Sequence, residues 1–192
     1  MKNYLTVLGM AFTFALPPSA HAQSVTPPPV PADIQVDASS EAFLLGRGVG
    51  TQNYVCQPST SLGRVAWTLF TPQATLFSDL DEQLTTHFFS PNPVEGGIVR
   101  VTWEDSRDTS IVWGLVIGSA VVTPDAIPWL LVQKAGTQVG PTGGATLSQT
   151  TFIQRVNTTG GLAPATGCDQ LKDVGRKRFV PYTANYFFFK KK

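Results

Sequence analysis

Hydrophobic and polar residues alternate over several short runs of this chain, and a two-residue period predicts half-buried β-strands. In residues 64–70, Val65, Trp67 and Leu69 fall on one face, with Arg64 and Thr68 on the other. β-Branched and aromatic residues, which suit pleated surfaces, dominate these runs. Similar runs predict further strands at residues 84–89, 98–103, 111–113, 115–122, 129–134, 150–156 and 182–189.

Clusters of Gly, Pro, Asn and Asp separate the runs and predict turns. The turns are expected at Thr71-Pro72, Ser90–Pro93, Glu95–Gly97, Thr123–Asp125 and Gly140–Gly144. The acidic segment 78–84 is expected to form at most one short helical turn. Many short strands with such spacing predict an all-β fold, a single antiparallel β-sandwich or barrel-like domain with long Gly/Pro-rich loops. In the last strand, alternate residues from Tyr182 to Phe188 are expected to face the core.

The N-terminus has the organisation of a cleavable signal peptide. A charged start precedes a short apolar run, and small residues in an A-x-A arrangement predict cleavage between Ala22 and Gln23. Residues 23–32 are rich in proline and read as a polyproline II linker, which acts as a spacer or lies along the domain surface. Residues 33–192 are then one β-domain. We expect a secreted or periplasmic protein without a transmembrane anchor after cleavage.

The charge balance excludes one class of partner. The chain has 14 Lys+Arg and 13 Asp+Glu, and loss of Lys2 with the leader leaves 13 against 13. A neutral mature chain argues against a nucleic-acid partner, because phosphate binding needs a basic surface.

Two cysteines, Cys56 and Cys168, remain after export. An oxidising compartment favours a structural disulfide between them, and no C-x-x-C pair supports redox catalysis. Closing so long a loop is worth about 4–5 kcal/mol on the chain-entropy model.

His87 is the one histidine beyond the leader, and it is the catalytic candidate. It would act as a general base for a serine nucleophile, but no G-x-S-x-G elbow accompanies it. Its aromatic neighbours Phe88 and Phe89 favour the alternative, a hydrogen-bonded structural histidine.

The acidic residues Glu104, Asp105 and Asp108 are the metal candidates, since carboxylates are ligands for calcium. Their spacing does not match an EF-hand loop, and a hairpin turn with Asp side chains bonded to the backbone is the favoured alternative. The glycines Gly46, Gly48 and Gly50 lack the G-x-G-x-x-G spacing of a dinucleotide site and are expected to supply positive φ angles in a turn. We therefore expect no cofactor.

Two further features bear on partners. Seven aromatic residues would form a sugar-binding platform only if they clustered on the surface: Trp67, Trp103, Trp113, Trp129, Tyr54, Tyr182 and Tyr186. Aromatics at alternating strand positions usually belong to the core. Asn157-Thr158-Thr159 fits a glycosylation acceptor in a eukaryotic secretory route.

Several longer stretches resemble one known family. They include Gly50–Cys56, Leu69–Phe77, His87–Pro91, Trp113-Gly114, Ala126–Leu131, Thr151–Gly161 and Phe179–Phe188. Together they are similar to the exported family catalogued as domain of unknown function 3455. The resemblance implies export and carries no established activity. Some members bear a malate dehydrogenase label, which this sequence does not support because it lacks a βαβ unit and a dinucleotide fingerprint.

From these observations we expect an envelope or extracellular binding module without enzymatic activity, for which a glycan or another envelope component is the expected partner. Its binding loops would lie around Asp105, residues 140–144 and residues 158–161. The alternatives are a secreted hydrolase using His87 and a structural or stress-protective surface protein.

Overall fold

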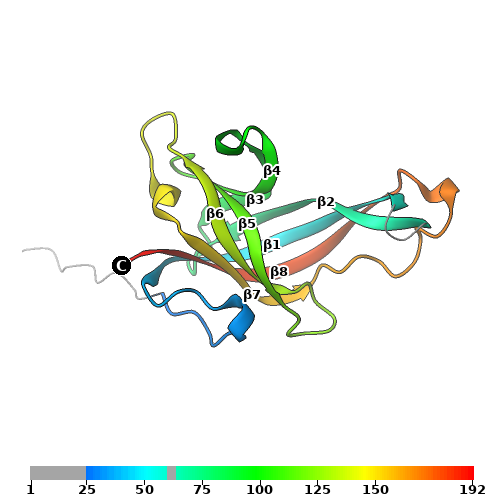
Figure 1. Ribbon diagram of the computed structural model, residues 1–192, viewed down its shortest axis with the longest axis horizontal. Helices are drawn as coiled ribbons and strands as arrows, with labels where there is room; N and C mark the ends of the chain where they lie inside the picture. Colours follow the sequence, from blue (N-terminus) through cyan, green and yellow to red (C-terminus); the bar gives the residue numbers. More distant parts are fainter. Residues whose placement is uncertain (1–24, 60–63) are drawn as a thin grey trace, which may run out of the picture.

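Eight antiparallel strands form a closed barrel in which each strand pairs with the next and β8 returns to β1 (Figure 1). This is a computed structural model, and it describes residues 25–59 and 64–192. The strands are β1 (Ser40–Ser59), β2 (Arg64–Phe77), β3 (Gln83–Asn92), β4 (Ile98–Asp105), β5 (Ile111–Ala120), β6 (Trp129–Gln138), β7 (Phe152–Gly160) and β8 (Lys177–Lys191). The helical elements are the short 3-10 turns η1 (Ala32–Ile34), η2 (Pro93–Glu95), η3 (Thr146–Gln149) and η4 (Leu171–Asp173). The all-β prediction is confirmed, in its barrel form.

The first strand differs most from its prediction. β1 runs for 20 residues, and Gly46, Gly48 and Gly50 lie inside it instead of forming a turn with positive φ. These glycines are needed because other chain segments approach closely. A Cβ at Gly48 would lie 2.7 Å from Cε2 of Tyr186, and one at Gly50 would lie 2.1 Å from the Gln73 carbonyl oxygen. The absence of three side chains lets residues of the two neighbouring strands, β2 and β8, pack closely against the β1 backbone.

The barrel interior is filled by side chains. Trp103, Tyr186 and Phe188 are its largest fully buried residues, and Phe188 and Tyr186 both pack edge-on against Trp103. Tyr182, Ala184, Tyr186 and Phe188 all belong to this core, as the two-residue period of the last strand predicts. A cavity among these side chains has a volume of about 20 Å³, close to that of a single water molecule. The interior is therefore a packed core and not a ligand chamber.

A second apolar layer lies on the outer wall. The side chains of Val25, Val30 and Val36 pack with Phe187 and Phe189 there. In the same layer, the Gln154 side-chain amide donates to the Ile34 carbonyl oxygen at 2.7 Å. The proline-rich segment thus runs along the barrel surface from residue 25 onward. The signal peptide and the Ala22–Gln23 cleavage site lie outside the described residues.

Strands β1, β2 and β8 continue past the barrel as a three-stranded extension (Figure 1). We call it the arm and define it as residues 51–59, 64–73 and 161–181. β2 pairs with β3 from Ala74 to Phe77, so the rest of β2 forms an edge of the arm. A proline cannot donate a hydrogen bond to a neighbouring strand, and Pro72 is tolerated because β2 has no partner on its β3 side at this position. The turn predicted at Thr71-Pro72 is wrong for that reason.

The segment between β2 and β3 is a hydrogen-bonded turn and not the expected helical one. The backbone N–H of Ser78 donates to the Glu82 carbonyl at 2.8 Å, and Asp81 has a positive φ of 60°. The Ser78 hydroxyl also accepts hydrogen bonds from the backbone N–H groups of Leu80 and Glu82. A serine that bonds the following backbone favours a turn over a helix.

Candidate functional site

An open groove lies on the outer wall where β2 and β3 separate beyond the Ala74–His87 pair. Its volume is about 680 Å³, within the range of ligand-binding clefts. The groove forms because β3 turns away with β4 while β2 continues into the arm with β1. It is lined by residues 49–51 of β1, 71–75 of β2 and 86–88 of β3.

The groove wall is rich in hydroxyl groups. Thr75 and Thr86 face each other across the β2–β3 ladder, and their hydroxyls have no hydrogen-bond partner among the described residues. Thr71 Oγ1 accepts from the backbone N–H of Phe89 at 3.1 Å, which ties the two diverging strands together. The Thr51 hydroxyl donates to the Asn53 side chain at 2.7 Å.

The remaining lining is an amide and two apolar side chains. Gln73 is exposed, Val49 is 56% exposed and Phe88 is half-buried. None of the lining residues carries a formal charge once His87 is neutral. Such a surface suits a neutral ligand that offers both hydroxyl groups and apolar faces.

His87 is part of the groove floor, but its side chain points into the barrel interior. The ring stacks on Trp103 with 4.4 Å between centroids, and Nδ1 lies 2.9 Å from the Thr102 carbonyl oxygen. Burial lowers the pKa of His87 from 6.5 to about 3; the hydrogen bond to Thr102 acts against this and the charge of Arg155 adds to it. The imidazole is thus neutral and shielded from solvent at pH 7, which is the environment of a structural histidine.

The carboxylates of Asp105 and Asp108 are used by the local backbone. Asp105 Oδ1 accepts from the N–H groups of Arg107 and Asp108, both at 2.9 Å. Asp108 accepts from Ser110 N through Oδ1 and from the Thr146 N–H and hydroxyl through Oδ2. Within the described ranges, no three His, Cys, Asp or Glu residues are grouped as a metal ion would need. These contacts favour the turn interpretation of the acidic segment.

The hydrogen bonds of the acidic turn lower the pKa of Asp108, and Glu104 lies outside this hydrogen-bonded group. Partial burial raises the pKa of Asp108, but the hydrogen bonds from Ser110 and Thr146 outweigh it and hold that pKa well below its usual range. Glu104 precedes Asp105 in β4, so the two side chains point to opposite faces of the strand. Glu104 therefore does not join the turn carboxylates.

Two of the three expected binding loops meet, and the third is elsewhere. The loop 140–144 packs on the acidic turn, because a Cβ at Gly144 would lie 2.2 Å from Cβ of Asp108. Both loops join strands at the same end of the barrel. Residues 158–161 lie at the opposite end, where the Thr158 hydroxyl donates to the Ile127 carbonyl and the Tyr54 hydroxyl to the Gly161 carbonyl. The predicted loop set is therefore not one surface.

The tryptophans do not form a surface platform. Trp103 is buried in the barrel interior, whereas Trp113 is buried outside that core cluster and donates to the Ser90 hydroxyl at 2.8 Å. Trp129 packs in the outer layer with the N-terminal segment, and Trp67 packs beside the disulfide. Asn157 is exposed and has a positive φ of 51°. Its glycosylation stays a prediction.

Sequence reasoning missed the groove threonines. Thr71, Gln73 and Thr75 alternate with buried residues along β2, and this pattern of outward polar positions was the available signal. What the local pattern does not contain is the separation of β2 from β3, which turns an ordinary outer wall into a groove.

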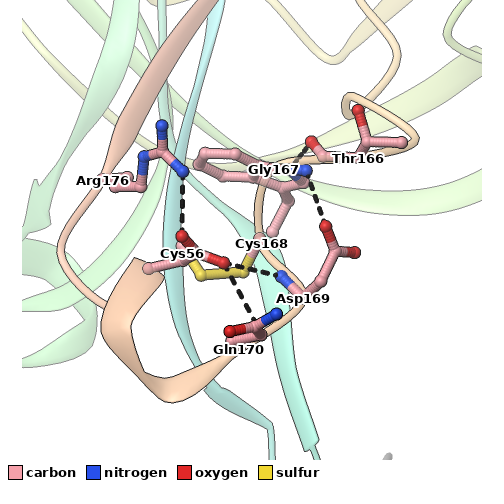
Figure 2. The surroundings of a disulfide bond; sticks show 9 residues. Cys56, Thr166, Gly167, Cys168, Asp169, Gln170 and Arg176 are labelled. Carbon is pink, nitrogen blue, oxygen red and sulfur yellow. Dashed lines mark hydrogen bonds and ion pairs between the residues drawn. A yellow bond between two sulfur atoms is a disulfide. The ribbon is translucent and has the colours of Figure 1, made fainter.

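The predicted disulfide is confirmed, since Cys56 and Cys168 are bonded across 112 residues with 5.4 Å between their Cα atoms. Figure 2 shows that the bond joins β1 to the loop before β8. The Trp67 indole N–H donates to the Thr166 carbonyl at 3.0 Å beside it. A long-range disulfide is compatible with an extracellular or periplasmic location.

A comparison with family models matches most of the chain. The model described as "Protein of unknown function (DUF3455)" matches residues 38–190, which include nearly the whole barrel and the arm. The chain belongs to this family. No curated protein and no solved structure matches this DUF3455 chain. In the described part of the DUF3455 chain, no helix has the length and hydropathy needed to cross a membrane.

Proposed function

We propose that this DUF3455 domain is a non-enzymatic binding module of the cell envelope or extracellular space, and that the β1–β2–β3 groove binds a neutral glycan. The observation that carries the proposal is the lining of the groove, which combines threonine hydroxyls, an amide and apolar side chains without a formal charge. Export itself stays part of the proposal, because the leader lies outside the described residues.

The chemistry of the lining matches that of a sugar. Each threonine hydroxyl donates one hydrogen bond and accepts others, and the Gln73 amide does both. These groups complement the hydroxyls of a saccharide, whose C–H faces would rest on Val49 and Phe88. The open shape of the groove allows a chain of sugar units to enter from the side, so the ligand need not be a terminal residue.

The environment of His87 supports a binding role over hydrolysis. A general base is most effective with a pKa near the working pH, whereas the pKa of His87 is lowered to about 3. The ring is also enclosed between Trp103 and Tyr186 inside the barrel. A substrate in the groove would meet the threonine hydroxyls and not the imidazole.

Isothermal titration with neutral gluco-, manno- and N-acetylglucosamine oligosaccharides tests the proposal. Thr86→Val removes one hydroxyl while keeping the shape, and losing a hydrogen bond to a neutral group is expected to weaken binding by about 0.5–1.5 kcal/mol. Thr142→Val, at an exposed loop position at the other end of the barrel, is the matched control and should bind as the unchanged protein does. Absence of binding by every oligosaccharide, or equal affinity for both variants, would contradict the proposal. In that case the structural or stress-protective alternative leads.

A further inference from the structure

The end of the arm exposes apolar side chains among cations. Leu171, at the start of η4, is 79% exposed and Val174 just after it is 45% exposed. Lys172, Arg176 and Lys177 lie in the same segment, and their residues are exposed. Figure 1 shows η4 at the far end of the molecule, away from the barrel. A protruding apolar tip beside basic side chains is the pattern of a surface that enters a membrane interface.

The charge of the arm differs from that of the rest of the chain. The arm has five basic residues, Arg64, Lys172, Arg176, Lys177 and Arg178, and two acidic ones, Asp169 and Asp173, which gives 5 − 2 = +3. The rest of the full chain has 14 − 5 = 9 basic and 13 − 2 = 11 acidic residues, which gives −2. The molecule is thus polarised, and the arm is the part that an anionic surface attracts.

The apolar tip is held in place by a built loop. Asp173 is 6% exposed, and its carboxylate accepts from the N–H groups of Asp169 and Gln170 and from Arg176 Nη1 at 2.8 Å. The backbone of residues 175 and 176 pairs with Cys56 through two hydrogen bonds of 2.9 and 2.8 Å. The disulfide fixes the start of the same loop to the same strand. Leu171 therefore projects from a rigid support and does not need to be ordered on binding.

Exposed apolar side chains and basic side chains also lie next to each other along the rest of the arm. Phe179 is 59% exposed, and the ammonium group of Lys177 lies 5.4 Å from the centre of the half-exposed Phe70 ring. On the other face of the arm, the Arg178 guanidinium lies 5.8 Å from the Trp67 ring. Long basic side chains that cover apolar rings keep their charged ends toward the solvent or toward lipid headgroups.

We infer that the end of the arm docks on the surface of an anionic lipid bilayer, with Leu171 and Val174 entering the headgroup region and the surrounding cations contacting lipid phosphates. A soluble anionic polymer would use the cations but would gain nothing from two exposed aliphatic side chains. This site is separate from the groove, so a bilayer-bound molecule would hold the groove away from the membrane.

Vesicle sedimentation of the disulfide-bonded protein tests the inference. We expect it to sediment with vesicles of phosphatidylcholine and phosphatidylglycerol, to sediment weakly with phosphatidylcholine alone, and to dissociate as salt is raised. Lys172→Glu changes the local charge by two units and is expected to weaken binding about thirty-fold. Leu171→Ser removes the apolar contact and is expected to weaken it about ten-fold.

Two matched controls lie outside the arm. Leu80→Ser replaces a leucine that is 82% exposed in the β2–β3 turn, and Lys134→Glu makes the same charge change in β6. Both should bind vesicles as the unchanged protein does, and all four variants should melt normally because the side chains are exposed. Equal binding to neutral vesicles, no binding to anionic ones, or equal effects of the control variants would overturn the inference. So would binding to polyglutamate that matches vesicle binding and is insensitive to Leu171→Ser.

Discussion

Removal of the Cys56–Cys168 bond is expected to lower the free energy of unfolding by about 4–5 kcal/mol, because it releases a loop of 112 residues in the unfolded chain. For a protein of this size, that loss corresponds to about 10–20 °C in melting temperature. The perturbation is the double variant Cys56→Ala/Cys168→Ala, compared with the oxidised protein by urea denaturation and calorimetry. Reduction of the unchanged protein by dithiothreitol should give a similar shift.

The loss of stability on removing the disulfide should also be uneven along the chain. Val65 and Trp67 pack on the two cysteines, and the loop before β8 is anchored to β1 next to Cys56. Hydrogen exchange should therefore rise first in the arm, while the backbone of β4 and β5 keeps its protection. A change below about 1 kcal/mol, or uniform loss of protection in barrel and arm, would refute the reasoning that the bond staples the arm.

Three further predictions concern the barrel. Gly48→Val should lower the urea midpoint by the equivalent of about 1–3 kcal/mol or more, because its Cβ would lie 2.7 Å from the Tyr186 ring; an unchanged midpoint would contradict this. The imidazole of His87 should show no NMR titration between pH 5 and 8. Near pH 6.5 only the unfolded chain takes up a proton on this histidine, so protonation favours the unfolded state as the pH falls. The free energy of unfolding should therefore fall from pH 6.5 toward 3 by up to about 1.4 kcal/mol per pH unit. A titration midpoint near 6.5 would refute this. Asp108→Ala should cost about 1–3 kcal/mol in denaturation, since it leaves partners in the turn unpaired, while the exposed Asp125→Ala should cost less than half of that.

The strands that were predicted well have a clear two-residue period and a buried face. In β8, the residues Tyr182, Tyr186 and Phe188 lie in the core as their spacing indicates. β5 merges two predicted strands, at 111–113 and 115–122, into one because Gly114 lies inside it. A Cβ there would be 2.3 Å from Cγ1 of Val132, so this glycine is explained by a close neighbour and not by a strand end.

The less predictable features depend on contacts between distant segments. From the sequence alone, the glycines of β1 indicate a turn. Their reason is the close approach of Leu76 and Tyr186, which the local sequence does not contain. Thr71-Pro72 resembles a turn until β2 is seen to be an edge strand at that point. The groove likewise depends on β3 leaving β2, and no local pattern contains this. The sequence favoured a structural role for His87 and a turn role for Asp105, because both interpretations depend on residues next to them in the chain.

NMR of methyl-labelled threonine during titration with the neutral oligosaccharides tests the groove most directly. The account predicts that the methyl signals of Thr51, Thr75 and Thr86 shift together and saturate, while that of Thr142 at the other end of the barrel stays in place. Saturating shifts confined to the loops at 140–144 or 158–161, or no shift at any threonine, would contradict the account.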